Sequence, residues 1–179
     1  RMIEQKKKKD VAKALDDLIK KHRKLADQTI KNSGIKKQLI EKLNDDVSEL
    51  QELVRGLTLL KEVSARSLDY LVSFGERLSD DLVSFALQDL KKKSTALNGK
   101  EVGIVTDSNF GESRPLMDTT RIRISKTLGS LLSKKVIPVV GGFAGADQHG
   151  NVTTFGRGGS DYTATIIASS ISADEVWLI

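Results

Sequence analysis

The chain has 179 residues, of which 39% are hydrophobic and 30% charged, a composition typical of a folded globular domain rather than a disordered chain. It has no cysteine and only two histidines, His22 and His149, which excludes disulfides, thiolate metal sites and a histidine metal cluster. The net charge of +5 is modest, no apolar run is long enough to span a bilayer and no secretory signal is present, so we expect a cytoplasmic protein that binds neither membranes nor nucleic acid.

Residues 11–32 and 35–55 predict two amphipathic helices, because apolar residues recur in both at the helical period of 3.6. Gly34 is the expected stop of the first helix, and Gly56 is the expected residue after the second. The two helices should form a hairpin at the amino end. His22 is expected at the margin of an apolar face, in a structural role.

A third helix is expected at residues 64–90. Its predicted buried stripe consists of Leu68, Leu71, Val72, Leu78, Leu82, Phe85 and Ala86. Gly75 interrupts this helix, and such a glycine usually has a reason such as close packing or approach of a ligand. The next residue, Glu76, falls at the edge of the stripe, so its carboxylate could point into a cleft or lie on the solvated margin.

In the second half of the chain the spacing of apolar residues no longer follows the helical period throughout. Residues 101–106 and 136–140 are short apolar runs that predict buried strands, and residues 125–135 predict a helix between them. Alternating strands and helices indicate an α/β fold with a mainly parallel sheet covered on both faces, in which ligands bind beyond the carboxyl ends of the strands. Residues 143–154 have the composition of a β-hairpin.

The hairpin leads into a glycine-rich segment, residues 152–164, which reads Val-Thr-Thr-Phe-Gly-Arg-Gly-Gly-Ser-Asp-Tyr-Thr-Ala. A helix expected at residues 161–170 follows it, and the free N–H groups and positive dipole at a helix start attract carboxylate or phosphate. The guanidinium of Arg157 could bind a carboxylate through two parallel hydrogen bonds. The alternative is a simple glycine-rich turn in which Ser160 is an ordinary N-cap.

Three segments together resemble one protein family. They read Ser-Phe-Gly-Glu-Arg-Leu-Ser at residues 73–79, Ile-Pro-Val-Val-Gly-Gly-Phe-Ala-Gly at residues 137–145 and Thr-Thr-Phe-Gly-Arg-Gly-Gly-Ser-Asp-Tyr at residues 153–162. In order and spacing they resemble the aspartokinases, members of the amino acid kinase family. The resemblance implies a three-layer αβα sandwich with a mainly parallel sheet. It also implies transfer of the γ-phosphoryl group of ATP, with Mg²⁺, to the side-chain carboxylate of L-aspartate, the first step of lysine, methionine and threonine biosynthesis.

The resemblance also implies roles for particular residues. Glu76 should meet the α-ammonium group of aspartate, and Arg157 should clamp a substrate carboxylate. Phe143 and Gly158 should line the same pocket, with Ser160 donating or accepting a hydrogen bond nearby.

Asp161, by the same resemblance, orients lysines that hold the phosphates of ATP. The nucleophile is already an ionised carboxylate, so the reaction depends on positioning and positive charge and needs no catalytic triad. No metal ligand is assigned in the sequence.

The sequence departs from the family pattern at both ends. The chain lacks the family's strand Lys-Phe-Gly-Gly-Thr, which carries a phosphate-binding lysine, and the strand Val-Val-Ser-Ala. It also lacks most of the ATP-binding segments and the regulatory ACT domains. The chain also begins with Arg1 and ends in an apolar run, residues 175–179, that is expected to be a strand needing neighbours. We therefore expect part of one catalytic domain, with a helical region at residues 1–63 and a substrate-binding α/β part at residues 64–179. Alone, this part is expected to be inactive, and the full-length protein is expected to be a homo-oligomer.

Three alternatives stay open on the sequence. A relative of the same fold could phosphorylate glutamate, acetylglutamate or a nucleoside monophosphate, although the segment at residues 73–79 has the aspartokinase form. A non-catalytic relative could sense an amino acid, since both phosphate-binding lysines are missing. A basic helical protein could bind nucleic acid through the lysine run at residues 6–9, but the chain lacks a base-stacking motif.

Overall fold

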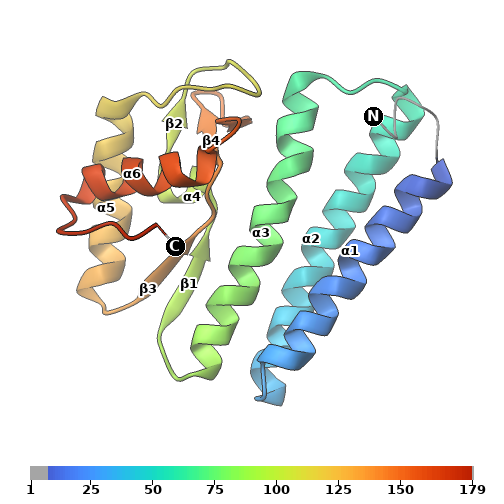
Figure 1. Ribbon diagram of the computed structural model, residues 1–179, viewed down its shortest axis with the longest axis horizontal. Coiled ribbons are helices and arrows are strands. Elements are labelled where there is room, and N and C mark those ends of the chain that lie inside the picture. Colours follow the sequence, from blue (N-terminus) through green and yellow to red (C-terminus); the bar gives the residue numbers. More distant parts are fainter. Residues whose placement is uncertain (1–7, 179) are drawn as a thin grey trace.

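The computed structural model describes residues 8–178, with side chains from residue 10 onward. Three long helices, α1 (Lys8–Thr29), α2 (Ser33–Leu60) and α3 (Ala65–Asp89), lie side by side along one half of the molecule (Figure 1). The first two form the expected hairpin, and α3 packs against α2. The lysine run at residues 6–9, through which nucleic acid could bind, falls outside the described side chains.

The predicted helix ends at Gly34 and Gly56 are wrong, and capping explains both. Asn32 is the N-cap of α2, with its side-chain oxygen accepting hydrogen bonds from the N–H groups of Gly34 at 2.9 Å and Ile35 at 3.1 Å, so Gly34 lies inside the helix. At the other end α2 continues past Gly56 because Leu57 is still buried against its neighbours. It ends at Lys61, which adopts the left-handed conformation (φ 57°) that glycine more often supplies.

Helix α3 forms where it is expected, starting after Ser64, whose hydroxyl accepts a hydrogen bond from the third residue of the helix. Its buried stripe was only partly predicted. Leu78 is buried, but Leu68 is 48% exposed and Val72 is 39% exposed. The polar residues Asp69 and Ser73 are buried instead, because α3 is covered on two sides, by α2 and by the strands.

The strands form two small sheets between the helices. In one, β1 (Ser94–Leu97) pairs in parallel with β3 (Ile137–Val140). In the other, β4 (Ala144–Asp147) pairs in parallel with β2 (Val105–Thr106) and antiparallel with β5 (Val152–Thr154). This confirms the predicted α/β fold with mainly parallel pairing and the hairpin at residues 143–154.

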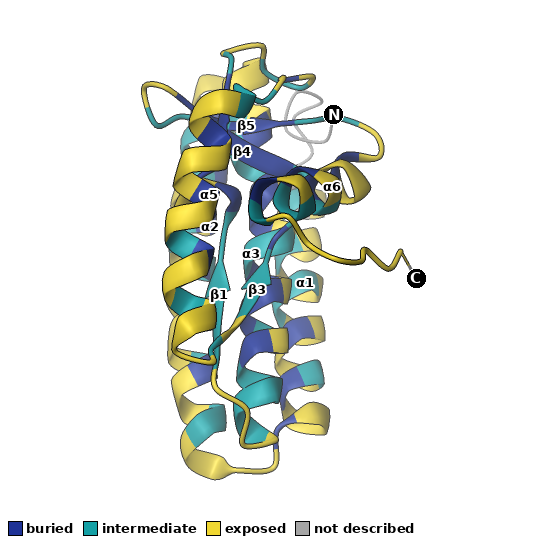
Figure 2. Cartoon of the chain, turned by 90° about the vertical axis from the view of Figure 1, so that its left-hand side faces the viewer, coloured by how far each residue is buried: buried dark blue, intermediate teal, exposed yellow. Residues whose placement is uncertain are grey.

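Helices cover both sides of these strands. Helix α3 lies on one side, and α5 (Met117–Ser133) and α6 (Gly159–Ile171) lie on the other (Figure 1). Buried residues gather on the helix faces turned towards the strands and towards neighbouring helices (Figure 2). The core between the strands, α5 and α6 contains Val102, Ile104, Ile124, Leu128 and Ile166.

The three long helices hold cores of their own. Their buried apolar residues include Ala26, Ile30, Leu39, Leu43, Leu50, Val54, Phe74 and Leu78. His22 is buried beside them, and its Nδ1 lies 2.9 Å from the carbonyl oxygen of Leu18, which fits the structural role expected for it.

The predicted strand at residues 101–106 is wrong for most of its length. A capping box between Asn98 and Glu101 starts a single helical turn, α4 (Gly99–Val102), and only Val105–Thr106 is extended. Strand β1, just before this turn, was not predicted. Residues 175–178 form no strand in the described structure, and Trp177 is 78% exposed.

Candidate functional site

One cavity brings together segments that are far apart in the sequence. It has a volume of about 370 Å³, within the range of about 300–1,000 Å³ typical of small-molecule sites. The residues that line it are Glu76, Phe143, Gly156, Gly158, Gly159, Ser160 and Asp161. Five of the six site residues expected from the sequence therefore share this cavity.

The start of α6 forms one wall of the cavity. Gly158 is the N-cap, with φ at 75°, a left-handed conformation that glycine adopts without strain, and no side chain caps the helix. The alternative reading of Ser160 as the N-cap is wrong, because Ser160 already lies inside the helix. The first N–H groups of a helix have no partner within it and carry the positive end of its dipole. The N–H of Gly159 donates to the carbonyl of Gly156 at 3.2 Å, and the next N–H groups, of Ser160 and Asp161, make this wall suited to a carboxylate or a phosphate.

Gly142 allows the loop after β3 to approach this helix closely. A Cβ atom at Gly142 would lie 2.8 Å from Cα and 2.9 Å from Oγ of Ser160, closer than such atoms normally come. The small residue at this position therefore sets the distance between the loop and the first turn of α6.

Phe143 is held in an unusual backbone conformation. Its φ is 71°, which is costly for a residue with a side chain. Its N–H donates to Oγ1 of Thr163 at 3.0 Å, and its carbonyl accepts from the N–H of Phe155 at 2.9 Å. These bonds fix Phe143 against α6 and place it in the wall of the cavity.

Glu76 enters the cavity from α3. It is partly buried, and this burial raises the pKa of its carboxyl group. The side chain of the neighbouring residue, Arg77, points towards α2, where its guanidinium forms ion pairs with Asp46 and, at 2.9 Å, with Glu49. No ion pair of Glu76 occurs within residues 10–178, which leaves its charge available to a ligand.

Asp69, two turns before Glu76, joins α3 to the glycine-rich segment. It is 2% exposed. Its Oδ2 accepts hydrogen bonds from the N–H groups of Gly111 and Thr154, each at 2.9 Å, and its Oδ1 accepts one from the Thr154 hydroxyl at 2.8 Å. Sequence reasoning missed this residue, because an aspartate on a helix normally indicates an exposed position.

Arg157 lies on the loop between Gly156 and Gly158, both of which line the cavity. Its own side chain is exposed and does not line the cavity. The expected clamp on a substrate carboxylate stays a prediction that requires the side chain to turn inward.

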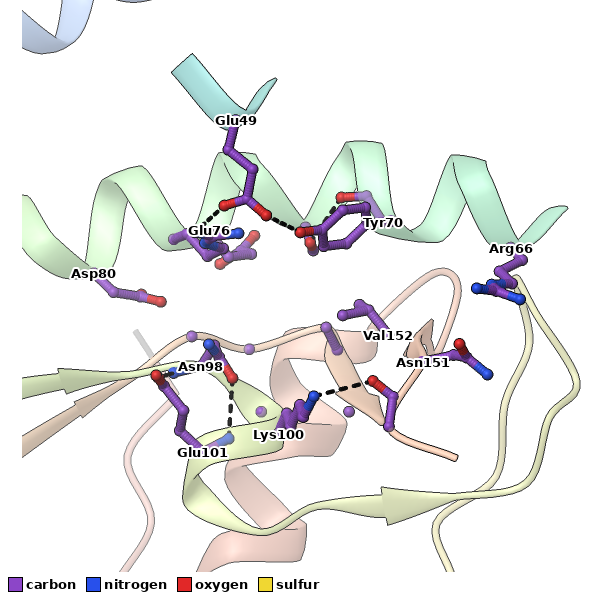
Figure 3. Close-up of a pocket in the computed structure, with 18 of the residues that line it drawn as sticks. Glu49, Arg66, Tyr70, Glu76, Asp80, Asn98, Lys100, Glu101, Asn151 and Val152 are labelled. Atoms are coloured by element: carbon purple, nitrogen blue, oxygen red, sulfur yellow. Dashed lines mark hydrogen bonds and ion pairs between the residues drawn. The ribbon is translucent and has the colours of Figure 1, made fainter. Parts of the chain in front are cut away.

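Glu76 also borders a larger cavity of about 780 Å³ (Figure 3). Helices α2 and α3 form one side of it, and α4 with the β4–β5 hairpin forms the other. Tyr70 donates a hydrogen bond to Glu49 on the helical side, and Lys100 donates one to the carbonyl of Gly150 at 3.2 Å on the opposite side. Asp80, which sequence reasoning did not single out, lines this cavity next to Glu76.

Residues 10–178 contain no group of three or more His, Cys, Asp or Glu side chains placed to hold a metal ion. None of the described helices combines the length and hydropathy needed to cross a membrane.

The sequence profile of the amino acid kinase family matches residues 9–179. The chain belongs to the amino acid kinase family. This confirms the family expected from the three motifs, and the cavity lies where two of those motifs, at residues 73–79 and 153–162, meet the third.

Relatives within the amino acid kinase family carry the names expected from the motifs. Aspartokinase 2, chloroplastic, of Arabidopsis thaliana is 34% identical over 151 residues, covering 83% of this chain and 27% of its own length. The aspartate kinase of Pseudomonas putida is 32% identical over 158 residues, covering 88% of this chain and 35% of its own. The resemblance to aspartokinases is therefore confirmed.

Solved structures of amino acid kinases share the fold. Escherichia coli aspartokinase III in complex with aspartate and ADP superposes with a TM-score of 0.70 at 28% identity, covering 76% of this chain and 30% of that one. The same enzyme in complex with lysine and aspartate gives a TM-score of 0.64 at 25% identity, and the match covers 88% of this chain and 39% of that one. The chain thus spans between about a quarter and two fifths of the length of these relatives.

Proposed function

We propose that the protein is an aspartate kinase, which transfers the γ-phosphoryl group of ATP to the side-chain carboxylate of L-aspartate and forms 4-phospho-L-aspartate. The observation that carries the proposal is the cavity in which Glu76 from α3 faces the uncapped start of α6. Membership of the amino acid kinase family, the names of the relatives and the aspartate and ADP in a solved relative support it.

The charges of the cavity match those of aspartate. The substrate has one ammonium group and two carboxylates at neutral pH. Glu76 supplies the negative partner for the ammonium group, and the N–H groups at the start of α6, together with the hydroxyl of Ser160, supply donors for a carboxylate. Phe143 closes the wall between them, and Arg157 adds a positive charge to the same end when its side chain turns inward.

The reaction needs orientation rather than proton removal. An oxygen of the substrate's side-chain carboxylate attacks the γ-phosphorus as the bond from that phosphorus to the oxygen bridging it to ADP breaks, and no proton is removed from the nucleophile. What the chain supplies is a fixed position for the carboxylate, set by Glu76 at one end of the substrate and by α6 at the other.

ATP fits the described residues only in part. The first turn of α6 suits a phosphate as well as a carboxylate, and Asp161 on that turn is placed to orient cationic groups that hold phosphates. Magnesium, when bound with the nucleotide, would neutralise charge on the phosphates. We assign no magnesium ligand, because the described residues offer no cluster of suitable side chains.

Calorimetric titration of L-aspartate into the intact protein tests the proposal. Glu76→Gln removes the charge that meets the ammonium group, and Arg157→Ala removes the guanidinium, so each is expected to weaken binding by about tenfold or more. Glu41→Gln on α2 and Arg121→Ala on α5 are matched controls at exposed positions outside the cavity, and both should bind as the parent does. Unchanged binding in both test variants would overturn the site assignment.

A competition assay shows which molecule accepts the phosphoryl group. With ATP present, we expect phosphoryl transfer to L-aspartate and not to glutamate or UMP. Binding of aspartate without any transfer by the intact protein would instead support an amino-acid sensor. Self-association of the intact protein, expected from the family, is measurable by light scattering.

A further inference from the structure

Asp80 is a buried carboxylate that forms no hydrogen bond or ion pair with the residues that the structure describes. It follows Glu76 by one helical turn, so the two side chains leave α3 on the same face, and both point from the helix into the larger cavity (Figure 3). Asp80 is only 8% exposed. Its Oδ2 has no hydrogen-bond partner among the described residues. A buried carboxylate oxygen left unpaired is unfavourable, so it indicates a missing partner.

The surroundings of Asp80 repel negative charge. Burial, followed by the charges of Glu76 and Asp81 on α3 and Glu101 on α4, raises the pKa of Asp80 to about 7. Lys42 on α2 lies 3.1 Å from Asp46 and 3.9 Å from Asp81. Arg66, Arg77 and Lys100 also line the larger cavity, but no ion pair of Asp80 occurs within residues 10–178.

The loop after β3 leaves just enough room for this carboxylate. A Cβ atom at Gly141 would collide with Oδ2 of Asp80, so this carboxylate oxygen packs directly against the loop. The adjoining groove, which Asp80 also lines, adds only one further acidic residue, Glu175, and no basic one.

The missing partner is therefore a hydrogen-bond donor with positive charge. A metal ion is not favoured, because the described residues provide no set of three ligands. An ammonium group has three donors and can bridge two carboxylates that lie one turn apart. Glu76 borders both the small cavity and the one that Asp80 lines, so a group held by Glu76 lies at the junction between them.

We propose that Asp80 is a second binding residue for the α-ammonium group of the substrate, sharing it with Glu76. This inference rests on the proposed function. Two carboxylates at one end of the site and helix N–H groups at the other select an amino acid against a dicarboxylate of the same length. Asp80 is thus a determinant of specificity for amino acids.

The sharpest test compares L-aspartate with succinate, which lacks the ammonium group. In the intact protein, Asp80→Asn keeps the shape of the side chain and removes its charge. We expect it to weaken L-aspartate binding about tenfold or more, and to leave succinate binding unchanged or stronger. Asp45→Asn, at an exposed carboxylate on α2 that lines neither cavity, is the control and should change neither affinity.

A second measurement uses the unaltered protein. Since Asp80 must be ionised to hold an ammonium group, L-aspartate binding at pH 6–7 should release protons, and succinate binding should not. Calorimetry in buffers of different ionisation enthalpy measures this release. The release should be smaller in Asp80→Asn, in which Glu76 is the carboxyl group left to ionise.

The outcomes distinguish the two proposals. If Glu76→Gln weakens L-aspartate binding but Asp80→Asn changes neither the affinities nor the proton release, the role of Asp80 is overturned and the proposed function stands. If the unaltered intact protein binds no L-aspartate, both fail. Loss of discrimination between L-aspartate and succinate in Asp80→Asn alone establishes the inference.

Discussion

Substitutions of Asp69 can separate the contribution of its hydrogen bonds to stability from the contribution of its charge. Asp69→Ala removes the acceptor of three hydrogen bonds, which leaves two N–H groups and the Thr154 hydroxyl without it. At about 1 kcal/mol net for each bond, the free energy of unfolding should fall by roughly 3 kcal/mol.

Asp69→Asn should cost much less. The amide oxygen can take the place of Oδ2 and accept from both N–H groups, and the amide nitrogen can donate to the Thr154 hydroxyl, which rotates to accept. Only the charge is lost, so we expect a decrease of about 1 kcal/mol.

Urea denaturation followed by circular dichroism measures both values, with Asp45→Ala, at an exposed position on α2, as the control expected within about 0.5 kcal/mol of the parent. Equal losses in the alanine and asparagine variants would show that the geometry of the bonds is unimportant. A loss below about 1 kcal/mol for Asp69→Ala would show that the carboxylate does not anchor β5 to α3.

Three further predictions concern the loop after β3 and the acidic face of α3. Gly142→Ala should push Ser160 away and destabilise the protein by about 1–3 kcal/mol, with weaker L-aspartate binding; equal stability and affinity, measured by denaturation and calorimetry, would contradict the close contact. Phe143→Gly should be more stable than Phe143→Ala by about 1 kcal/mol, since both lose the ring but only glycine relieves the positive φ, and thermal unfolding of the two variants decides this. Folding raises the pKa of Asp80 from 3.8 to about 7. Between about pH 4 and pH 7 the folded protein therefore keeps a proton on Asp80 that the unfolded chain has lost, so the free energy of unfolding without ligand should fall as the pH rises through this range. Asp80→Asn should reduce this fall and be the more stable protein at pH 8 in denaturation experiments; a profile identical to that of the parent would refute the shift.

The sequence predicted the elements whose signals are local. The third helix starts at Ser64 because a serine cap and an apolar period coincide there. Gly34 and Gly56 misled the prediction, since glycine marks a helix end only where the chain turns, and here Asn32 and Lys61 mark the ends instead. The apolar run after Asn98 was read as one strand, although the capping box turns its first half into a helix.

The candidate site was predicted through glycines and charges that stand out in the sequence. Gly158, Ser160 and Asp161 lie at the glycine-rich helix start, Phe143 joins them from the loop after β3, and Glu76 joins them from α3. Asp69 and Asp80 were missed, because on an isolated helix an aspartate indicates solvent. Their burial follows from the strands that cover α3, which no local pattern reveals.

The consecutive residues Glu76 and Arg77 connect two parts of the molecule through one helix. Rotation of α3 about its own axis would move the first within the ligand cavity and the second against Asp46 and Glu49 on α2 at the same time. An amino acid held by Glu76 would therefore also resist rotation of α3 against α2. By reciprocity, an interaction that favours the same rotation of α3 would change the affinity for the amino acid by the factor by which the amino acid changes that interaction.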